Sequence, residues 1–365
     1  MEETTKKLYP LRFVEKEAEM PWGHVSYQIA DLGAIDSMVY DGWLGGNSLS
    51  ELMGTFLERV VGDDAFEFYG LQFPILVKVM KTSGKQPLQI NAADDVAEER
   101  YDSFGKTAFW FVKEASEDAS LFLGLNRDVD AGEFYRRCQE GTAEEILNVI
   151  HPKVGDSFVI KPGTVYAAGP GLTIVEISEC SELSFNLETE LEEAFDLIDF
   201  HRFISSAALT PRSTSASRTP PPTTSAVPPL TWPRVATVAE GSMPSEDSGK
   251  GCKLAEEAEF KVTRFDLENP LHIFSDQPGS FAIYHCISGE AFVQAPTESG
   301  GYENYPLKAG ASILVPSEVN DFMLFPAADK TVLLEATVER RTLTDSYTDG
   351  KPADDTPDPH VRQWN

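Results

Sequence analysis

Short apolar segments that end at Gly, Pro or Ser recur along this chain and constrain its fold more than any other feature. Val, Ile and Phe dominate these segments, and runs of this length and composition are typical of β-strands. Few helical patterns separate them, and an excess of strands predicts a β-barrel or jelly roll. The clearest runs in the first part of the chain are FPILVKVM (73–80), TAFWFV (107–112), SLFLG (120–124), SFVIKPG (157–163) and TIVEIS (173–178).

The same pattern returns from residue 251 onward, with turns at intervals of about 8–12 residues, as in a second barrel. Helices are announced by capping patterns. SLSE (48–51) precedes apolar residues at helical spacing, with Gly62 at the end. DAGE (130–133) and TAEE (142–145) predict a helical pair near 131–150. The sequence therefore predicts a mainly β protein of two jelly-roll barrels with a small helical insertion.

The segment 203–250 differs in composition from the rest of the chain. Residues 203–239 contain no Asp, Glu or Lys and consist largely of Ser, Thr, Pro and Ala. Such a composition cannot build a packed core and predicts a disordered linker. The abrupt change also allows a frameshifted stretch of coding sequence. We therefore expect a first domain at 1–202, a linker at 203–250, a second barrel at 251–340 and an acidic disordered tail at 341–365.

Charge and cysteine usage exclude several classes of function. The 365 residues include 30 basic and 59 acidic side chains, a net charge of −29. This charge repels nucleic-acid backbones and anionic lipid, so neither is expected as a partner. No run has the length of a membrane span or the form of a signal peptide. The four cysteines form no C-x-x-C pair and predict free thiols in a reducing compartment. We expect a cytoplasmic protein.

Several segments resemble the class I, bacterial-type mannose-6-phosphate isomerases, in the order and spacing of that family. They are PWG (21–23), FPILVKVM, GKTAFW (105–110), KPGTVYAAGPG (161–171), VEISECSELSFN (175–186), FAIYHCISGEAFV (281–293) and LKAGASILVP (307–316). The resemblance implies a cupin fold and interconversion of mannose 6-phosphate and fructose 6-phosphate. Moving a proton between C1 and C2 forms an enediol, whose oxygen charge a zinc ion can stabilise.

The positions that the resemblance assigns to the zinc ligands are substituted. The family's Gln-x-His strand corresponds to Gln89 and Asn91, its Glu after Gly-Lys-Thr to Ala108, and its second His to Tyr166. The family's catalytic arginine falls at Asn186. An amide is a poor zinc ligand, alanine is none, and a phenol must first ionise. We therefore predict a degraded metal site with no bound zinc or other cofactor, and Tyr166 as a side chain that fills the cavity.

Three charged residues remain at pocket positions of the family. Lys78 and Lys106 suit phosphate or sugar hydroxyls, and Glu176 suits proton transfer as a vestigial or retained base. Alternatively, the lysines and the glutamate only pair across the barrel.

Three functions follow from these observations. The first is a pseudoenzyme of carbohydrate metabolism that binds sugar or sugar phosphate, or regulates, without zinc-dependent catalysis. The second is an active aldose–ketose isomerase with an altered site, supported by Glu176, Lys78 and Lys106. The third is a scaffold for protein partners, which predicts no thermal shift with hexose phosphates.

Overall fold

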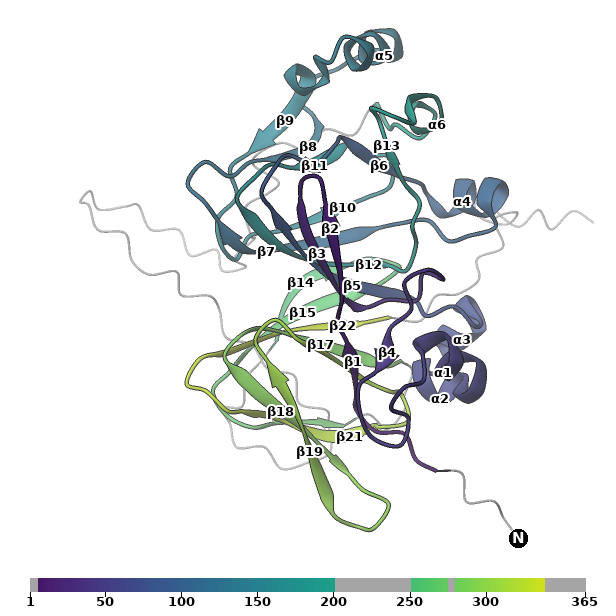
Figure 1. Cartoon of the computed structure of the whole chain (residues 1–365), viewed down its shortest axis with the longest axis vertical. Coiled ribbons are helices and arrows are strands. Elements are labelled where there is room, and N and C mark those ends of the chain that lie inside the picture. The colour runs from purple at the N-terminus through teal and green to yellow at the C-terminus, as the bar shows by residue number, and fades with distance from the viewer. Residues whose placement is uncertain (1–5, 201–250, 275–279, 339–365) are drawn as a thin grey trace, which may run out of the picture.

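The computed structural model describes residues 6–200, 251–274 and 280–338, which form two stacked β-barrels (Figure 1). Each barrel consists of two antiparallel sheets, and the predicted fold class is confirmed. The proposed linker lies outside the described residues from 203 to 250, as does the predicted tail at 341–365. Among the described residues, no helix is both long and apolar enough to cross a bilayer.

The first barrel pairs a six-stranded sheet with a five-stranded one. The larger sheet has the order β10-β7-β12-β5-β3-β2, and the smaller has the order β13-β6-β11-β8-β9. The larger contains β2 (Lys16–Met20), β3 (Gly23–Ile29), β5 (Ile75–Thr82), β7 (Ala108–Ala115), β10 (Ser157–Ile160) and β12 (Leu172–Glu179). The smaller contains β6 (Gln89–Asn91), β8 (Leu121–Leu125), β9 (Leu147–Ile150), β11 (Tyr166–Ala168) and β13 (Ser184–Asn186).

The second barrel pairs a seven-stranded sheet of order β14-β15-β22-β17-β20-β1-β4 with a four-stranded sheet of order β16-β21-β18-β19. The larger contains β1 (Leu11–Val14), β4 (Met38–Val39), β14 (Cys252–Glu256), β15 (Lys261–Leu267), β17 (Ala282–Ser288), β20 (Ser312–Val315) and β22 (Thr331–Thr337). The smaller contains β16 (Leu271–Phe274), β18 (Glu290–Pro296), β19 (Tyr302–Lys308) and β21 (Asp321–Pro326). Strands β1 and β4 therefore extend the second barrel, although they precede the first barrel in the chain. The division into domains at 1–202 and 251–340 remains a prediction, and this pairing shows that the two halves share a sheet.

Alternating residues of the large sheets face either a barrel interior or the other barrel. In β7, Phe109 and Phe111 belong to the core between the barrels, whereas Ala108 and Trp110 face the interior of the first barrel. Every residue of β12 is buried. This explains why its sequence reads as a nearly continuous apolar run, since a strand covered on both faces has no solvent side. Burying each large apolar side chain contributes about 1.5–3 kcal/mol, so this double-sided core holds the barrels together.

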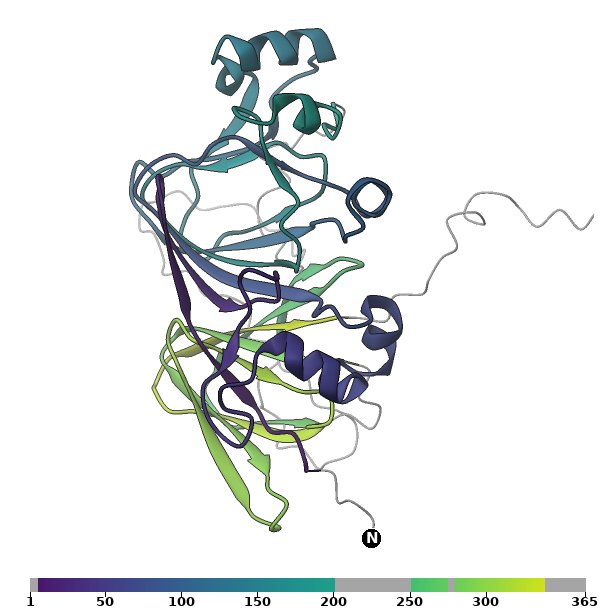
Figure 2. The same ribbon diagram turned by 45° about the vertical axis from the view of Figure 1, so that its right-hand side comes forward.

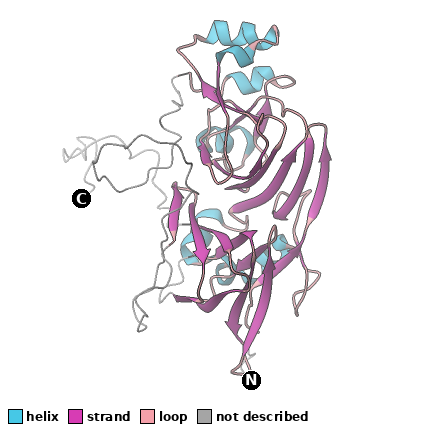
Figure 3. Ribbon diagram, turned by 90° about the vertical axis from the view of Figure 1, so that its left-hand side faces the viewer, coloured by secondary structure: helices cyan, strands magenta, loops and turns pink. Residues whose placement is uncertain are grey.

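The helices lie outside the barrels and are α1 (Leu49–Phe56), α2 (Glu58–Val61), α3 (Asp63–Tyr69), α4 (Asp94–Tyr101), α5 (Ala131–Gln139), η1 (Ala143–Ile146) and α6 (Leu191–Phe195). The predicted capping box is present, because Ser48 Oγ accepts from Glu51 N and Glu51 accepts from Ser48 N. The helix does not run unbroken to Gly62, because Leu57 adopts a φ of 52°. Figures 2 and 3 show α5 and α6 at the end of the first barrel away from the second barrel.

The insertion near 131–150 contains less helix than predicted. Asp130 caps α5 by accepting from Glu133 N at 2.8 Å. The second capping pattern, TAEE, forms only the 3₁₀ turn η1, and Thr142 makes no side-chain cap. Residues 147–150 are strand β9, which pairs with β8.

Candidate functional site

The residues assigned to the degraded metal site lie on strands that face the interior of the first barrel. Gln89 and Asn91 lie on β6, Ala108 on β7 and Tyr166 on β11. Tyr166 is directly opposite Gln89 in the antiparallel pairing. Ala108 belongs to the opposite sheet, and it joins Tyr166 in one buried apolar cluster. The fold thus brings together residues separated by up to 77 positions in the chain, from 89 to 166.

The Tyr166 side chain is buried and hydrogen-bonded. Its hydroxyl donates to Asn91 Oδ1 at 2.8 Å, and Ser184 Oγ donates to the same oxygen at 2.8 Å. Its ring meets Trp110 edge-on, with centroids 5.4 Å apart and planes at 88°. Burial raises the pKa of Tyr166, and the negative charge of Glu176 adds to this effect. The phenol is therefore a neutral hydrogen-bond donor.

The retained charged residues form a cluster in the same interior. Glu176 lies directly opposite Lys78 on the neighbouring strand. The Lys78 and Lys106 ammonium nitrogens lie 3.1 and 3.4 Å from Glu176 Oε1. The other oxygen of Glu176 accepts from Trp110 Nε1 at 2.8 Å. The charge pairing considered from the sequence is present, with Lys78 and Glu176 on neighbouring strands of one sheet, and two ammonium groups share one carboxylate.

Burial and mutual charge set the pKa values of this cluster. Burial on its own would raise the pKa of Glu176, but the charges of Lys78 and Lys106 outweigh it and lower that pKa to about 2. Burial and the charge of Lys78 lower the pKa of Lys106 to about 8, against the opposing effect of Glu176. At neutral pH, Glu176 is ionised and Lys106 is close to its titration range. The cluster can therefore offer both a carboxylate and a titratable ammonium group.

Asn186, at the position of the family's arginine, is engaged in local structure. Its side-chain oxygen accepts from Glu188 N at 2.8 Å, and its backbone N–H donates to Glu190 at 2.8 Å. It lies opposite Gln89 in the β13–β6 pairing. Asn186 therefore caps the turn after β13. The roles given to these positions from the sequence remain predictions.

Two polar partners in this interior were not identified from the sequence. Ser184 shares the Asn91 oxygen with Tyr166, and Trp110 donates to Glu176. No motif marks Ser184. Trp110 could have been identified from the sequence. It lies on the strand face that points into the barrel, and the N–H of a buried tryptophan needs a hydrogen-bond partner.

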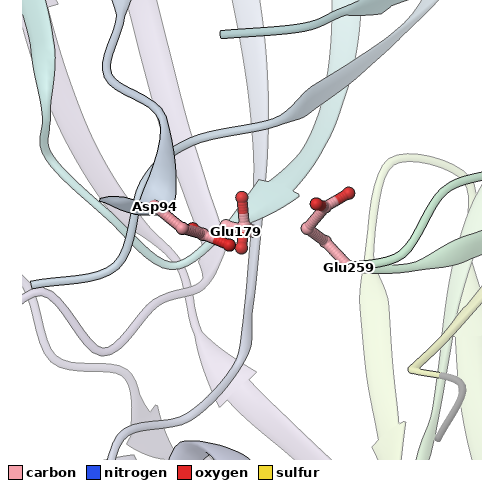
Figure 4. A group of neighbouring side chains, drawn as sticks. All are labelled: Asp94, Glu179 and Glu259. Atoms are coloured by element: carbon pink, nitrogen blue, oxygen red, sulfur yellow. The ribbon is translucent and has the colours of Figure 1, made fainter. Parts of the chain in front are cut away.

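A group of three acidic residues lies between the two barrels, outside the barrel interior (Figure 4). One carboxylate oxygen from each of Asp94, Glu179 and Glu259 lies within 4.8 Å of the others, an arrangement that could hold a metal ion. Glu179 also accepts from Thr107 N at 2.8 Å, and Asp94 from Gly105 N at 3.0 Å. The long separations between these residues in the chain left no sequence signal.

Comparisons with known proteins give consistent neighbours. No protein-family model matches the chain. The Bacillus subtilis protein GmuF, described as a probable mannose-6-phosphate isomerase, is 29% identical over 152 residues, covering 41% of this chain and 46% of GmuF. The mannose-6-phosphate isomerase ManA of the same organism is 28% identical over 152 residues, with the same coverage. The match thus spans about half the length of these curated relatives.

Solved structures match nearly the whole chain. The mannose 6-phosphate isomerase of Bacillus subtilis superposes with a TM-score of 0.70 at 17% identity, covering 90% of this chain and 99% of that protein. A phosphomannose isomerase variant from Salmonella typhimurium gives a TM-score of 0.67 at 12% identity, covering 92% and 100%. At these identities the structural likeness establishes the shared cupin fold alone.

Proposed function

We propose that this chain functions in carbohydrate metabolism, because its sequence and structural neighbours point to the class I mannose-6-phosphate isomerase family. It is a cytoplasmic, isomerase-like protein that binds a sugar or sugar phosphate in the first barrel. It does not carry out zinc-dependent catalysis.

The hydrogen bond from Tyr166 to Asn91 carries this proposal. Zinc in proteins is held by thiolates, imidazoles and carboxylates. Here a protonated phenol points at an amide oxygen that also accepts from Ser184, and Ala108 contributes no donor atom. The residues present do not fit a zinc ion, because the Tyr166 hydroxyl and the Asn91 side-chain oxygen bind each other. No catalytic step through a metal is therefore assigned to this barrel.

The charged cluster supports an anionic ligand. Lys78 and Lys106 carry two positive charges against the single negative charge of Glu176, so the cluster has a net charge of +1 when all three are ionised. The chain as a whole carries −29. The attraction between a positive charge and an anion is stronger inside a barrel than at the surface, because water screens it less there. A sugar phosphate would approach Lys78, whose side chain is 16% exposed, more readily than the deeper Lys106.

Metal content and isomerase activity test the proposal together. Protein purified without chelator should contain no zinc that depends on the first barrel, and a coupled assay should detect no conversion of mannose 6-phosphate. A variant with Asp94→Asn and Glu259→Gln separates any metal held by the acidic group of Figure 4 from metal held in the barrel. Stoichiometric zinc that persists in this double variant would overturn the proposal.

Ligand binding is tested by thermal shift with mannose 6-phosphate and fructose 6-phosphate, with inorganic phosphate and free mannose as controls. Both sugar phosphates should raise the melting temperature of the wild-type protein. Lys78→Met should abolish the shift, because it removes the more accessible ammonium group. Arg100→Met, on the exposed side of α4, is the matched control and should keep the shift. The absence of any shift would favour a scaffold function.

The second candidate is an active isomerase with an altered site. Its support is the buried carboxylate of Glu176 beside Lys106, whose lowered pKa of about 8 allows proton exchange near neutral pH. Turnover in the coupled assay that disappears in Glu176→Gln would establish this alternative. Turnover that survives Glu176→Gln would be assigned to a contaminating enzyme.

A further inference from the structure

A pocket on the second barrel is lined by none of the residues of the charged cluster in the first barrel. It has a volume of about 430 Å³ and opens between the N-terminal segment, the loop at 41–43 and the β18–β19 hairpin. Figure 1 shows this hairpin at the end of the second barrel away from the first barrel. The volume falls within the range of about 300–1,000 Å³ that is usual for small-molecule sites.

Three aromatic rings contribute to this pocket. Tyr9 stacks on Tyr305 with centroids 5.9 Å apart and planes at 21°, and it lies 6.3 Å from Trp43. Trp43 is 37% exposed, although it also packs edge-on against Phe56. The pocket therefore presents an aromatic surface to solvent that is supported from behind by a further ring.

The aromatic rings are fixed by hydrogen bonds. The Tyr9 hydroxyl donates to the Asp41 carbonyl oxygen at 2.6 Å and accepts from Leu44 N at 3.1 Å. The Trp43 indole N–H donates to the Lys7 carbonyl oxygen at 3.3 Å. Because both polar tips bind backbone groups, the rings are held in place before any ligand arrives.

The polar lining is balanced in charge and offers donors and acceptors side by side. Three basic side chains (Lys6, Lys7 and Arg12) face three acidic ones (Asp41, Glu298 and Glu303) around the pocket. Arg12 pairs with Asp41, and Glu303 accepts from the Tyr305 hydroxyl at 3.0 Å. Asn304 adds a carboxamide at the edge. A site with zero net charge does not select an anion or a cation.

We propose that this pocket binds a neutral sugar, as a hexose or a short oligosaccharide. A pyranose ring has one apolar C–H face, which packs on an aromatic ring whose face carries partial negative charge. Its hydroxyl groups both donate and accept hydrogen bonds, and paired carboxylate, guanidinium and carboxamide groups meet that requirement. The site is on the second barrel and does not depend on the function proposed for the first.

Lys6 marks where the sugar would lie. Its ammonium nitrogen lies 4.6 Å from the centroid of the Trp43 ring, so this face already attracts positive charge. Lys6 is exposed and can swing aside. The C–H face of the sugar takes its place on Trp43, so Lys6 competes with the sugar for this ring.

Saturation-transfer NMR and calorimetry on the full chain test the site with mannose, glucose and their linear trisaccharides. Binding with a dissociation constant on the order of 1 mM is expected. Trp43→Ala should weaken it at least about tenfold, as loss of an aromatic anchor does in other interfaces. Trp43→Phe should retain most of the binding. Lys6→Ala should bind at least as tightly as the wild type.

Matched variants make the result specific. Tyr302→Ala removes a ring that is 71% exposed on the same hairpin and does not line the pocket, so binding should be unchanged. Arg100→Met, on the first barrel and outside the lining of this pocket, should also leave it unchanged. Asn304→Ala, at the edge of the pocket, should weaken binding even if Trp43→Ala disturbs the fold.

Three outcomes would overturn the proposal. One is no saturation transfer from any of these sugars at 10 mM, on the order of ten times the expected constant. Another is equal binding by the wild type and both Trp43→Ala and Asn304→Ala. The third is preferential binding of choline over every sugar, which would make the pocket a site for an organic cation.

Discussion

The interiors of the two barrels differ although their architecture is the same. The first contains the ionised cluster of Lys78, Lys106 and Glu176. In the second, an apolar cluster surrounds Tyr284, whose hydroxyl donates to Glu335 at 2.6 Å. The described residues of the second barrel thus form a barrel of the same architecture without a buried group of three charges. The fold alone does not require the cluster, and this supports a ligand-related role for it in the first barrel.

The comparison also shows why the first barrel is the more sensitive of the two to substitution. Three charges in a buried site stabilise one another only as a complete set, and removing one leaves the others unpaired. In the second barrel Glu335 is paired with the Tyr284 hydroxyl, and burial raises the pKa of Glu335. A carboxyl group whose pKa is raised lies in surroundings that favour its neutral form, so the second barrel should tolerate the loss of this negative charge.

The largest expected effect comes from giving the first barrel a metal site. Asn91→His, Ala108→Glu and Tyr166→His together should raise zinc affinity from undetectable to a dissociation constant of about 1 μM, or about 8 kcal/mol. The reason is that three strong ligands would then join Gln89 on strands that already meet in one interior. Calorimetry with zinc measures the change. Isomerase activity should stay low until Asn186→Arg is added.

The matched control for this design is the double variant without Ala108→Glu, which should bind zinc more weakly because it lacks a carboxylate ligand. If the triple variant folds and binds no zinc, the positions do not converge on one metal site. The mapping of the family ligands onto these residues would then be wrong.

The next expected effect contrasts the loss of stability caused by substitution of Glu176 with that caused by substitution of Glu335. Glu176→Gln should lower the free energy of unfolding by about 3–5 kcal/mol, because two buried ammonium groups lose their counter-charge. Glu335→Gln should lower it by less than about 1 kcal/mol, because the carboxamide oxygen still accepts from Tyr284. Urea unfolding at pH 7 measures both variants. Equal losses would remove the contrast between the barrels.

Glu176 and Glu335 should contribute with opposite signs to the change in protein stability as the pH falls. The pKa of Glu176 is lowered to about 2, so its stabilising effect is complete above the ordinary value near 4.5 and disappears as the pH falls toward 2. This loss amounts to about 3 kcal/mol. The pKa of Glu335 is raised, so its contribution is present at acid pH and declines as the pH rises.

Urea unfolding between pH 7 and pH 3 separates these contributions. Glu176→Gln should lose less stability on acidification than the wild type, whereas Glu335→Gln should lose slightly more. An unchanged acid slope in Glu176→Gln would mean that Glu176 is not held ionised by the two lysines.

Local patterns made much of the fold predictable. The β-rich runs mark strands such as β5, β7 and β12, and the Ser48–Glu51 capping box forms as its spacing implies. The pairing of β1 with β20 was not predictable, because it joins residues about 300 positions apart and depends on tertiary packing.

The site was predictable only in part. Family motifs pointed to the positions of Asn91 and Tyr166, but no short-range pattern could show that Ser184 completes their hydrogen bonding. Asp94 and Glu259 come together because the two barrels stack, and sequence spacing carries no trace of that contact.

The smallest effect compares the two interior tyrosines. Tyr166→Phe keeps the ring contact with Trp110 and removes one hydrogen bond to Asn91 Oδ1, which still accepts from Ser184. The expected loss is about 0.5–1.5 kcal/mol, the usual net contribution of such a bond. Tyr284→Phe should be more costly, at about 2 kcal/mol, since it removes a hydrogen bond of 2.6 Å to a carboxyl group. Thermal and urea unfolding measure both changes. A loss near zero for Tyr166→Phe would mean that Tyr166 only fills space, as the sequence suggested, and a loss larger than that of Tyr284→Phe would make the Tyr166–Asn91 bond the stronger constraint on its barrel.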